Sequence, residues 1–341
     1  MSNPPVMQSD PDTVPPDVCA AIRSATRVAL VGHVTPDADC LGALGALWLA
    51  LPELGKHAHM ALPAGTVSRK LSFLVKHAGM EPAREGDLQS CDLVVVLDTA
   101  KARRVNLDGK LDALPGIPVL NIDHHATNTR FGKWNWIGAD RSSTAEMVYE
   151  LLLALGCQIT PTVATLLYAG VHTDTHGFSL ANTTSRSLQV GYELAQAGAR
   201  VREVCERLHR SHSRSEFDLL KVVYGNTRVS EDGRLAWSTA SYEELSAAGC
   251  AAADIDDQVN VPRSVEGIAV AILFTEGSPG KVRINFRGEG EVSVLELAQQ
   301  FGGGGHHASA GAMLNGTLAE IVDQVVRAAK AYVAALPGNA G

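Results

Sequence analysis

The chain has 341 residues, of which 45% are hydrophobic and 19% charged, and its formal net charge at pH 7 is −8. This length predicts two domains. The negative charge argues against a protein that tracks long nucleic acid, because such proteins gain affinity by neutralising phosphates with a basic surface. We therefore expect a small or short anionic substrate held by local charges, or no nucleic acid at all.

The cysteines and the apolar segments indicate the cellular compartment in which the protein is expected. Six cysteines occur without a CxxC pair, so reduced thiols are expected in a chain of this size. Residues 1–16 lack the basic and apolar regions of a signal peptide and are expected to form a disordered tail. The longest apolar stretch, near 41–51, is too short to cross a bilayer. We expect a cytoplasmic protein with no membrane partner.

The first two thirds of the chain predict strands in alternation with helices. Strands are expected at 27–33, 92–98 and 117–123, where short apolar runs end on polar residues or glycine, and at 57–62. Helices are expected at 41–51, 68–79, 142–156, 160–175, 183–199 and 201–223. This alternation predicts an α/β domain with a parallel sheet.

The last third has a different pattern. Strands are expected at 234–241, 266–277 and 281–290, followed by helices at 293–302 and 318–336. This order predicts a smaller α+β domain. The expected layout is a tail at 1–16, a first domain at 17–205, a helical linker at 206–228 and a second domain at 229–337.

Polar side chains follow three of the predicted strands. His33, Asp98 and Asp123 stand at strand ends, and Asp37 and Asp39 follow His33 closely. Sites in open α/β sheets gather at the carboxyl ends of the strands, so these residues are expected to share one crevice. Oxygen and imidazole ligands without thiolate suit Mn²⁺ or Mg²⁺. With the 123–125 cluster included, a set of four aspartates and two histidines exceeds what one ion needs, which predicts a two-metal site able to accept a phosphate.

Three further stretches carry candidate ligands or contacts. "DHHATN" (123–128) has two adjacent histidines after a strand, and "GVHTDTHGF" (170–178) offers His172, Asp174 and His176. The second stretch is also compatible with a polar helix end closed by Gly177. "FGGGGHHASAGA" (301–312) is compatible with a linker. Its position between two predicted helices also allows a phosphate-binding loop.

Five motifs in order resemble the DHH phosphoesterase family: "GHVTPDADCLGA", "VVLDTA", "NIDHHATN", "GVHTDTHGF" and, for the DHH-associated C-terminal domain, "GGGGHHASAG". The resemblance implies two lobes with the active site in the cleft between them. It implies that His33 and Asp37 hold one Mn²⁺, that Asp39, His124 and Asp174 hold the other, and that Asp98 bridges the two. Mg²⁺ or Co²⁺ are possible substitutes.

The resemblance also implies roles in catalysis and substrate binding. Asp123 would orient a histidine, and His125 would lie over the substrate phosphate. The implied substrate contacts are Arg287, Gly303, Gly304, Gly305 and His306. The first motif of the family commonly ends in Gly-Ser, whereas here Ala43 follows Gly42. We expect no loss of metal from this difference, because the family serine is not a ligand.

Within the family, the compact layout resembles the nanoRNase and pAp phosphatase group. This resemblance implies a homodimer that hydrolyses short oligoribonucleotides or dinucleotides such as pApA, with c-di-AMP a further candidate, by a metal-activated water. It also implies removal of the 3′-phosphate of 3′-phosphoadenosine 5′-phosphate (pAp). The alternatives are an inorganic pyrophosphatase, a single-strand-specific exonuclease and a nucleotide sensor without catalysis.

Overall fold

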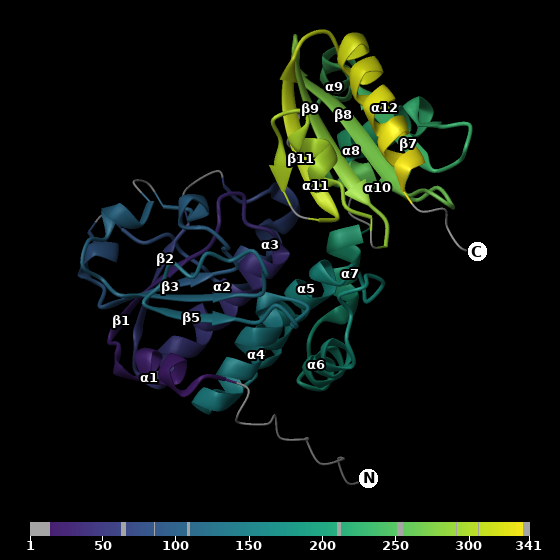
Figure 1. The fold of residues 1–341 in the computed structure, drawn as a ribbon. Coiled ribbons are helices and arrows are strands. Elements are labelled where there is room, and N and C mark those ends of the chain that lie inside the picture. Colours follow the sequence, from purple (N-terminus) through teal and green to yellow (C-terminus); the bar gives the residue numbers. More distant parts are fainter. Residues whose placement is uncertain are drawn as a thin grey trace, which may run out of the picture. The chain divides into compact units, whose positions relative to one another are not determined.

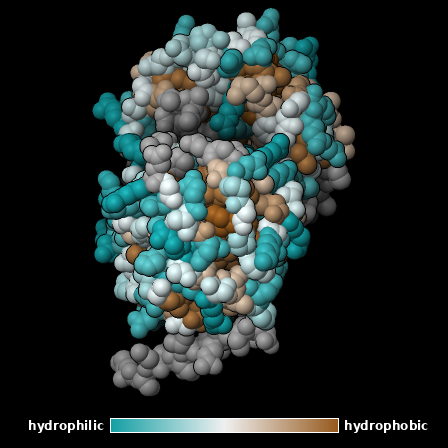
Figure 2. Space-filling view, turned by 90° about the vertical axis from the view of Figure 1, so that its left-hand side faces the viewer, coloured by the Kyte–Doolittle hydropathy of each residue, from teal (hydrophilic) through white to brown (hydrophobic). Residues whose placement is uncertain are grey.

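A computed structural model describes residues 14–62, 66–84, 86–107, 110–209, 213–250, 255–290, 292–305 and 307–336. The chain divides into two compact units, residues 1–211 and 212–341, which Figure 1 draws together. No helix in these described ranges is long and apolar enough to span a membrane. On the side drawn in Figure 2 most side chains are hydrophilic and the hydrophobic ones form small separate areas, since the apolar residues fill the cores.

The boundary between the units falls inside the segment 206–228 that was expected as a linker. Helix α7 (Val201–His209) packs into the core of the first unit through Val204 and Leu208. Helix α8 (Arg214–Asn226) packs in the second unit through Leu219 and Val223. A capping box formed by Ser213 and Glu216 starts α8 as a new helix. The predicted continuous helix at 201–223 is therefore two helices.

The first unit contains a parallel sheet with strand order β2-β1-β3-β4-β5. Its strands are β1 (Arg27–Val31), β2 (His57–Ala61), β3 (Leu93–Leu97), β4 (Val119–Asp123) and β5 (Trp134–Ile137). The first four occupy the predicted positions, and the parallel-sheet prediction is confirmed. β5 was not predicted. It is a short edge strand with a mostly half-buried side-chain pattern, and its pairing with β4 makes it part of the sheet.

Helices cover one face of this sheet. Besides α7, the unit contains α1 (Pro16–Ser24), α2 (Ala38–Ala50), α3 (Ser72–Ala78), α4 (Thr144–Leu155), α5 (Pro161–Asp174) and α6 (Ser185–Gln196). α1 was not predicted: it begins at Pro16, the last residue of the predicted tail, and Val14 of that tail is buried in the core, whereas residues 1–13 lie outside the described ranges. A Cβ on Gly42 would lie 2.4 Å from the Leu166 carbonyl oxygen, so glycine allows α2 and α5 to pack closely. The other face is covered by the segment around Val105 and Leu114.

The second unit contains a mixed sheet with strand order β10-β11-β9-β8-β7-β6. The strands are β6 (Arg228–Val229), β7 (Leu235–Ala240), β8 (Val270–Ser278), β9 (Lys281–Gly288), β10 (Gly304–Gly305) and β11 (Ser309–Asn315). β7 and β8 run parallel and the other neighbours antiparallel. The helices are α8, α9 (Tyr242–Ala248), α10 (Asn260–Arg263), α11 (Leu295–Gln299) and α12 (Leu318–Ala335). This confirms the predicted second α+β domain. Five of its elements were not predicted: β6, β10, β11, α9 and α10.

Candidate metal centre

The sheet topology brings His33 and Asp98 together. β1 connects to β2 on one side of the sheet, whereas β3, its other neighbour, leads on to β4 and β5. Loops that leave β1 and β3 therefore diverge at the carboxyl edge and open a crevice. His33 lies two residues beyond β1, and Asp98 directly follows β3. Asp98 has a φ of 52°, a left-handed conformation that costs a non-glycine residue about 1 kcal/mol.

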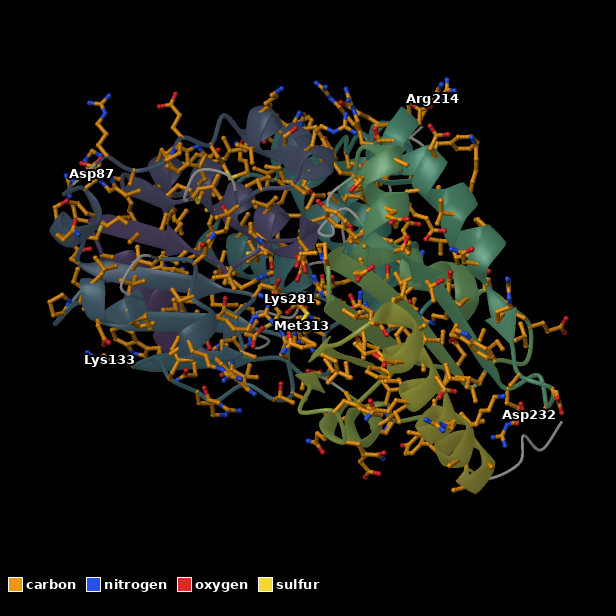
Figure 3. The ribbon with its side chains drawn as sticks, turned by 90° about the horizontal axis from the view of Figure 1, so that it is seen from above. Asp87, Lys133, Arg214, Asp232, Lys281 and Met313 are labelled. Carbon is orange, nitrogen blue, oxygen red and sulfur yellow. The ribbon has the colours of Figure 1, made fainter. Side chains whose placement is uncertain are left out.

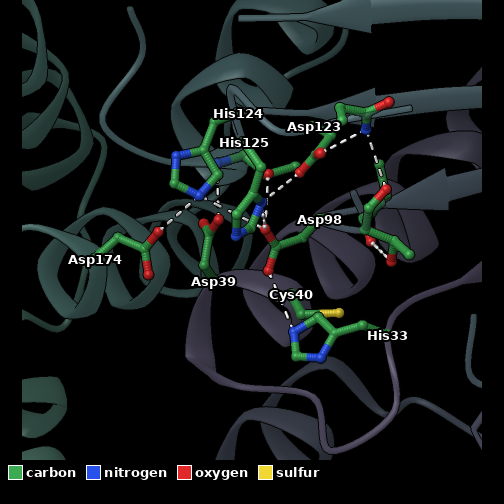
Figure 4. A network of polar contacts seen from close by, with 12 residues as sticks. His33, Asp39, Cys40, Asp98, Asp123, His124, His125 and Asp174 are labelled. Carbon is green, nitrogen blue, oxygen red and sulfur yellow. Dashed lines mark hydrogen bonds and ion pairs between the residues drawn. The ribbon is translucent and has the colours of Figure 1, made fainter. Parts of the chain in front are cut away.

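The two oxygens of Asp98 face different groups of side chains (Figure 4). Its Oδ2 lies 3.4 Å from Nε2 of His33. Its Oδ1 lies 3.7 Å from Nε2 of His124 and 3.6 Å from Nδ1 of His125. The side chain is almost completely buried. This carboxylate therefore stands between two separate sets of donor atoms.

The first set contains His33, Asp37 and Asp98. The Nδ1 atom of His33 lies 2.8 Å from the Val34 carbonyl oxygen, and Nε2 lies 3.7 Å from Oδ2 of Asp37. Donation from Nδ1 leaves Nε2 directed at the two carboxylates, as in metal-ligating histidines. Burial alone would lower the pKa of His33, but hydrogen bonds with Asp37 and Asp98 raise it to about 11. A divalent cation would replace that proton.

The second set contains Asp39, His124 and Asp174, whose ligand atoms lie within 4.8 Å of one another. Nε2 of His124 is 3.1 Å from Oδ2 of Asp174. Burial raises the pKa of Asp174 to about 6, although its hydrogen bond with His124 acts in the opposite direction. Burial and the charges of Asp174 and Asp98 also raise the pKa of Asp39 well above its ordinary value. A cation bound here would relieve this repulsion.

The N-terminus of α4 holds Asp39 in place. The backbone N–H groups of Thr144 and Ala145 donate to its two carboxylate oxygens at 2.7 and 2.8 Å. Helix N-termini carry a partial positive charge, which stabilises this fully buried carboxylate. A Cβ on Gly170 would lie 2.7 Å from Oδ1 of Asp39, so only glycine allows α5 to pass so close. Two helices thus determine where the Asp39 carboxylate lies.

The donor chemistry fits two divalent cations. The carboxylates of Asp37, Asp39, Asp98 and Asp174 would bring four negative charges, and two divalent ions would balance them. Carboxylate and imidazole donors suit Mn²⁺, Mg²⁺ or Co²⁺. Cys40 also lies within 4.8 Å of His33 and Asp98. However, burial raises the pKa of its thiol well above the ordinary value, so the thiol stays protonated and is a poor ligand.

Asp123 contacts His125 and Asn128. Its Oδ1 lies 2.7 Å from Nδ1 of His125, and its Oδ2 accepts a hydrogen bond from Nδ2 of Asn128 at 2.6 Å. Burial would raise the pKa of Asp123, but these two neighbours lower it. Burial would likewise lower the pKa of His125, whereas Asp123 and Asp98 raise it. The pair therefore favours a protonated His125 with fixed ring orientation.

The structure adds residues that sequence reasoning missed. Thr144 donates its hydroxyl to Oδ1 of Asp98 at 3.2 Å. Asn128 also donates to the carbonyl oxygen of Thr99 and to Oδ1 of buried Asn121. The stretch "SSTAE" was interpreted only as a helix start, although a hydroxyl in the first turn of a helix was the available signal. Asn128 was quoted within "DHHATN" without a role.

The candidate residues of "GVHTDTHGF" (170–178) separate in the structure. Asp174 joins the second donor set, whereas His172 packs against Tyr168 with ring centroids 5.5 Å apart and lies 3.8 Å from the Cys205 sulfur. Among the described residues, neither His172 nor His176 belongs to a group with metal-ligand spacing. Ala43 is fully buried in the hydrophobic core.

The predicted substrate contacts belong to the second unit. Arg287 lies on β9, where its Nη1 donates to the Phe286 carbonyl oxygen at 3.0 Å. Gly304 and Gly305 form the edge strand β10 rather than an irregular loop, and β10 pairs with β11. A Cβ on Gly303 would lie 2.2 Å from the Gly311 carbonyl oxygen, so close packing of the two backbone segments requires glycine at this position. His306 lies outside the described residues.

Comparison with known proteins agrees with the two units. Residues 27–171 match the DHH family, N-terminal domain, and residues 240–335 match the DHHA1 domain. A protein of Thermus thermophilus named bifunctional oligoribonuclease and PAP phosphatase NrnA is 34% identical over 304 residues, which cover 88% of this chain and 87% of that protein.

Two solved structures show the same fold. One is an exopolyphosphatase-related protein from Bacteroides fragilis, with a TM-score of 0.83, 24% identity and coverage of 92% of this chain and 95% of that one. The other is RecJ from Thermus thermophilus in complex with Mn²⁺, with a TM-score of 0.53, 16% identity and coverage of 98% of this chain and 56% of that one.

Proposed function

Since the chain belongs to the DHH family and is a hydrolase acting on phosphoester bonds, we propose that it cleaves short oligoribonucleotides and dinucleotides to mononucleotides. We also propose that it removes the 3′-phosphate of pAp, with two Mn²⁺ ions as cofactor. The bifunctional name of the Thermus thermophilus relative supports both activities. The Mn²⁺ in the RecJ structure supports the choice of metal.

One observation carries the two-metal part of this proposal. The buried Asp98 directs Oδ2 towards His33 and Oδ1 towards His124, at 3.4 and 3.7 Å from their Nε2 atoms. A carboxylate that serves one ion needs only one such set of donors. His33, Asp37 and Asp98 would hold one ion, and Asp39, His124, Asp174 and Asp98 the other. Bound there, the ions would lower the pKa of an attacking water and withdraw charge from the phosphoryl oxygens.

We assign proton transfer to His125. Asp123 holds its Nδ1 atom at 2.7 Å and stabilises the protonated imidazole, while Asn128 fixes the other oxygen of Asp123. Nε2 of His125 can then donate a hydrogen bond to a phosphoryl oxygen and give its proton to the leaving oxygen. A buried carboxylate beside the imidazole maintains the correct ring orientation through this step.

The second unit supplies the proposed substrate contacts. Arg287 would bind a phosphate through its planar guanidinium group, which suits two phosphate oxygens at once. The backbone N–H groups of Gly303–Gly305 and the His306 side chain would approach the substrate from the same unit. These contacts would distinguish nucleotides from inorganic pyrophosphate.

One comparative assay tests the proposal. The metal-stripped protein is supplied with Mn²⁺, Mg²⁺, Co²⁺ or Ca²⁺ and offered pAp, di- to pentaribonucleotides, pApA, c-di-AMP and pyrophosphate. We expect hydrolysis of pAp and short RNA that stops with chelator and returns best with Mn²⁺. Preferential hydrolysis of pyrophosphate would replace the proposal by a pyrophosphatase, and binding without turnover would replace it by a nucleotide sensor.

A further inference from the structure

Four cationic side chains stand on the two loops that follow β3 and β4. Lys101, Arg103 and Arg104 come directly after "DTA" at 98–100, and Arg130 follows "DHHATNT" at 123–129. Arg103, Arg104 and Arg130 are exposed and Lys101 is half-buried. We call these four residues the basic loop patch. The stretches 100–104 and 128–130 contain no acidic residue, although the whole chain has a net charge of −8.

Backbone hydrogen bonds attach the first of these loops to the His33 loop. The Val34 N–H donates to the Arg104 carbonyl oxygen at 2.8 Å, and the Asn106 N–H donates to the Gly32 carbonyl oxygen at 2.8 Å. His33 and Val105 form a β-bridge between these bonds. The 3₁₀ turn Ala102–Arg104 therefore runs directly beside a proposed metal ligand.

The second loop is attached to the first. The Thr129 N–H donates to the Ala100 carbonyl oxygen at 2.9 Å, and the Asn128 side chain donates to the Thr99 carbonyl oxygen at 3.2 Å. Lys101 is three residues beyond Asp98, and three residues span at most about 11 Å. All four cations therefore belong to loops that leave the metal centre within the first unit.

These cations differ from several others of the first unit, which form ion pairs with carboxylates. Arg141 and Arg186 pair with the buried Glu150, and Arg202 pairs with Glu206. In the described ranges, no ion pair involves any of the four patch residues. Among the described residues no carboxylate neutralises these cations, and cations beside a phosphate-hydrolysing centre attract further phosphates.

We propose that the basic loop patch binds the backbone phosphates of single-stranded RNA on one side of the scissile bond. This inference rests on the proposed function and extends it, since it assigns a site for nucleotides that the metal centre does not reach. Each cation contacts one phosphate without reading a base, so binding is independent of sequence. The patch therefore favours substrates of three to five nucleotides over dinucleotides.

The test compares two double variants that remove the same charge. The patch variant carries Arg103→Gln and Arg104→Gln. The control variant carries Arg84→Gln and Lys133→Gln, two exposed cations of the same unit. Arg84 lies beside Asp87, to which its N–H donates, and Lys133 precedes β5; Asp87 and Lys133 are at the margin of the unit in Figure 3. Circular dichroism and thermal melting establish that both variants fold.

Two measurements decide the result. The first is the dissociation constant of a pentaribonucleotide in chelator, at several salt concentrations. We expect about tenfold weaker binding for the patch variant. The slope of log K against log salt concentration should be less steep by about 1.4, because each of the two lost phosphate contacts reduces that slope by about 0.7. The second is the ratio of kcat/KM for pentaribonucleotide to that for dinucleotide with Mn²⁺. We expect this ratio to fall in the patch variant and to stay constant in the control variant.

The outcomes separate this inference from the proposed function. Pentaribonucleotide binding that is equally strong in both variants, or a loss of kcat/KM that is equal at every substrate length, overturns the patch. Failure of the unmodified protein to hydrolyse any nucleotide contradicts the proposed function, whereas the binding measurement in chelator still decides whether the patch holds RNA.

Discussion

The hydroxyl of Thr144 donates to Oδ1 of Asp98 at 3.2 Å, while the backbone N–H of the same residue donates to Oδ2 of Asp39 at 2.7 Å. One residue at the start of α4 therefore contacts a proposed bridging ligand and a ligand of the second ion. The helix start is itself fixed, because Ser143 caps it and Glu146 accepts from both the N–H and the hydroxyl of Ser142.

Replacement of Thr144 by valine should weaken metal binding more than it weakens the fold. Valine keeps the shape and the backbone contact with Asp39 but removes the donor to Asp98, so Oδ1 of that carboxylate loses one of the contacts that orient it. We expect the Mn²⁺ dissociation constant to rise by about tenfold, in the range seen for groups that orient metal ligands. Calorimetric titration of the metal-free protein measures it. Thr144→Ser retains the hydroxyl and should restore binding; equal loss in both variants would contradict the positioning role.

Replacement of Asp98 by asparagine should abolish turnover more completely than any other single change of a ligand. Asparagine tolerates the positive φ at this position, so the fold should be retained. We expect kcat to fall by about 10³-fold or more, because both ions lose a partner. Mn²⁺ bound per chain and kcat are measured together.

Cys40→Ala is the control for that measurement, since the Cys40 sulfur is close to the same donors but protonated. It should keep the metal stoichiometry of the unmodified chain. Near-normal activity in Asp98→Asn would rule out the bridging role, and metal loss in Cys40→Ala would make the thiol a ligand.

Replacement of Asp123 by asparagine should lower kcat by about 10²-fold, with little change in Mn²⁺ stoichiometry. The carboxylate contacts His125 and Asn128, and its loss removes the group that raises the pKa of His125. The descending limb of the plot of kcat against pH should therefore move to lower pH. A lowered kcat with an unmoved pH profile would show that Asp123 acts only on the fold.

The metal-free protein should lose stability as pH rises from 5 to 8. Burial raises the pKa of Asp174 to about 6 and that of Asp39 well above its ordinary value, so the folded state binds more protons than the unfolded state. Stability then falls as pH rises. The raised pKa of His33 also makes the folded state less stable with rising pH above 6.5. The stabilisation that comes from its protonated imidazole is lost as pH approaches about 11.

Thermal melting with and without Mn²⁺ measures this effect. We expect Tm of the metal-free protein to fall by about 5 °C over this range. The increase in Tm caused by Mn²⁺ should be larger at pH 8, because cations replace protons at the cluster. Asp174→Asn should flatten the metal-free profile, and a Tm that instead rises with pH would contradict the protonated cluster.

Replacement of Arg287 by alanine should raise KM for pAp and dinucleotides by about tenfold without changing metal content. Lys281→Gln is a control on the same strand, since Lys281 lies six positions before Arg287 on β9, about 20 Å away. Loss of Mn²⁺ from the Arg287 variant would refute its role as a substrate contact.

The sequence by itself determined the parallel sheet of the first unit and the edge of that sheet at which its polar residues gather. Buried strands such as β3 have continuous apolar runs, and a polar residue such as Asp98 or Asp123 marks the end of some of these runs. The sequence also identified the family, because five motifs in the same order are specific for that family, whereas each motif alone is not. The helix break at Ser213 was missed although the capping box of Ser213 and Glu216 is a local signal for it, whereas β5 was missed because it depends on its pairing with β4.

Only the tertiary structure decided which side chains act on one another. Nothing in the sequence pairs Thr144 with Asp98 and Asp39, because the three residues meet through the packing of α4 on α2 and the sheet. The attachment of the Arg103–Arg104 turn to the His33 loop likewise depends on hydrogen bonds between backbone groups, which every residue carries. Residue types and their spacing report what chemistry is available, whereas distances between segments remote in sequence depend on packing.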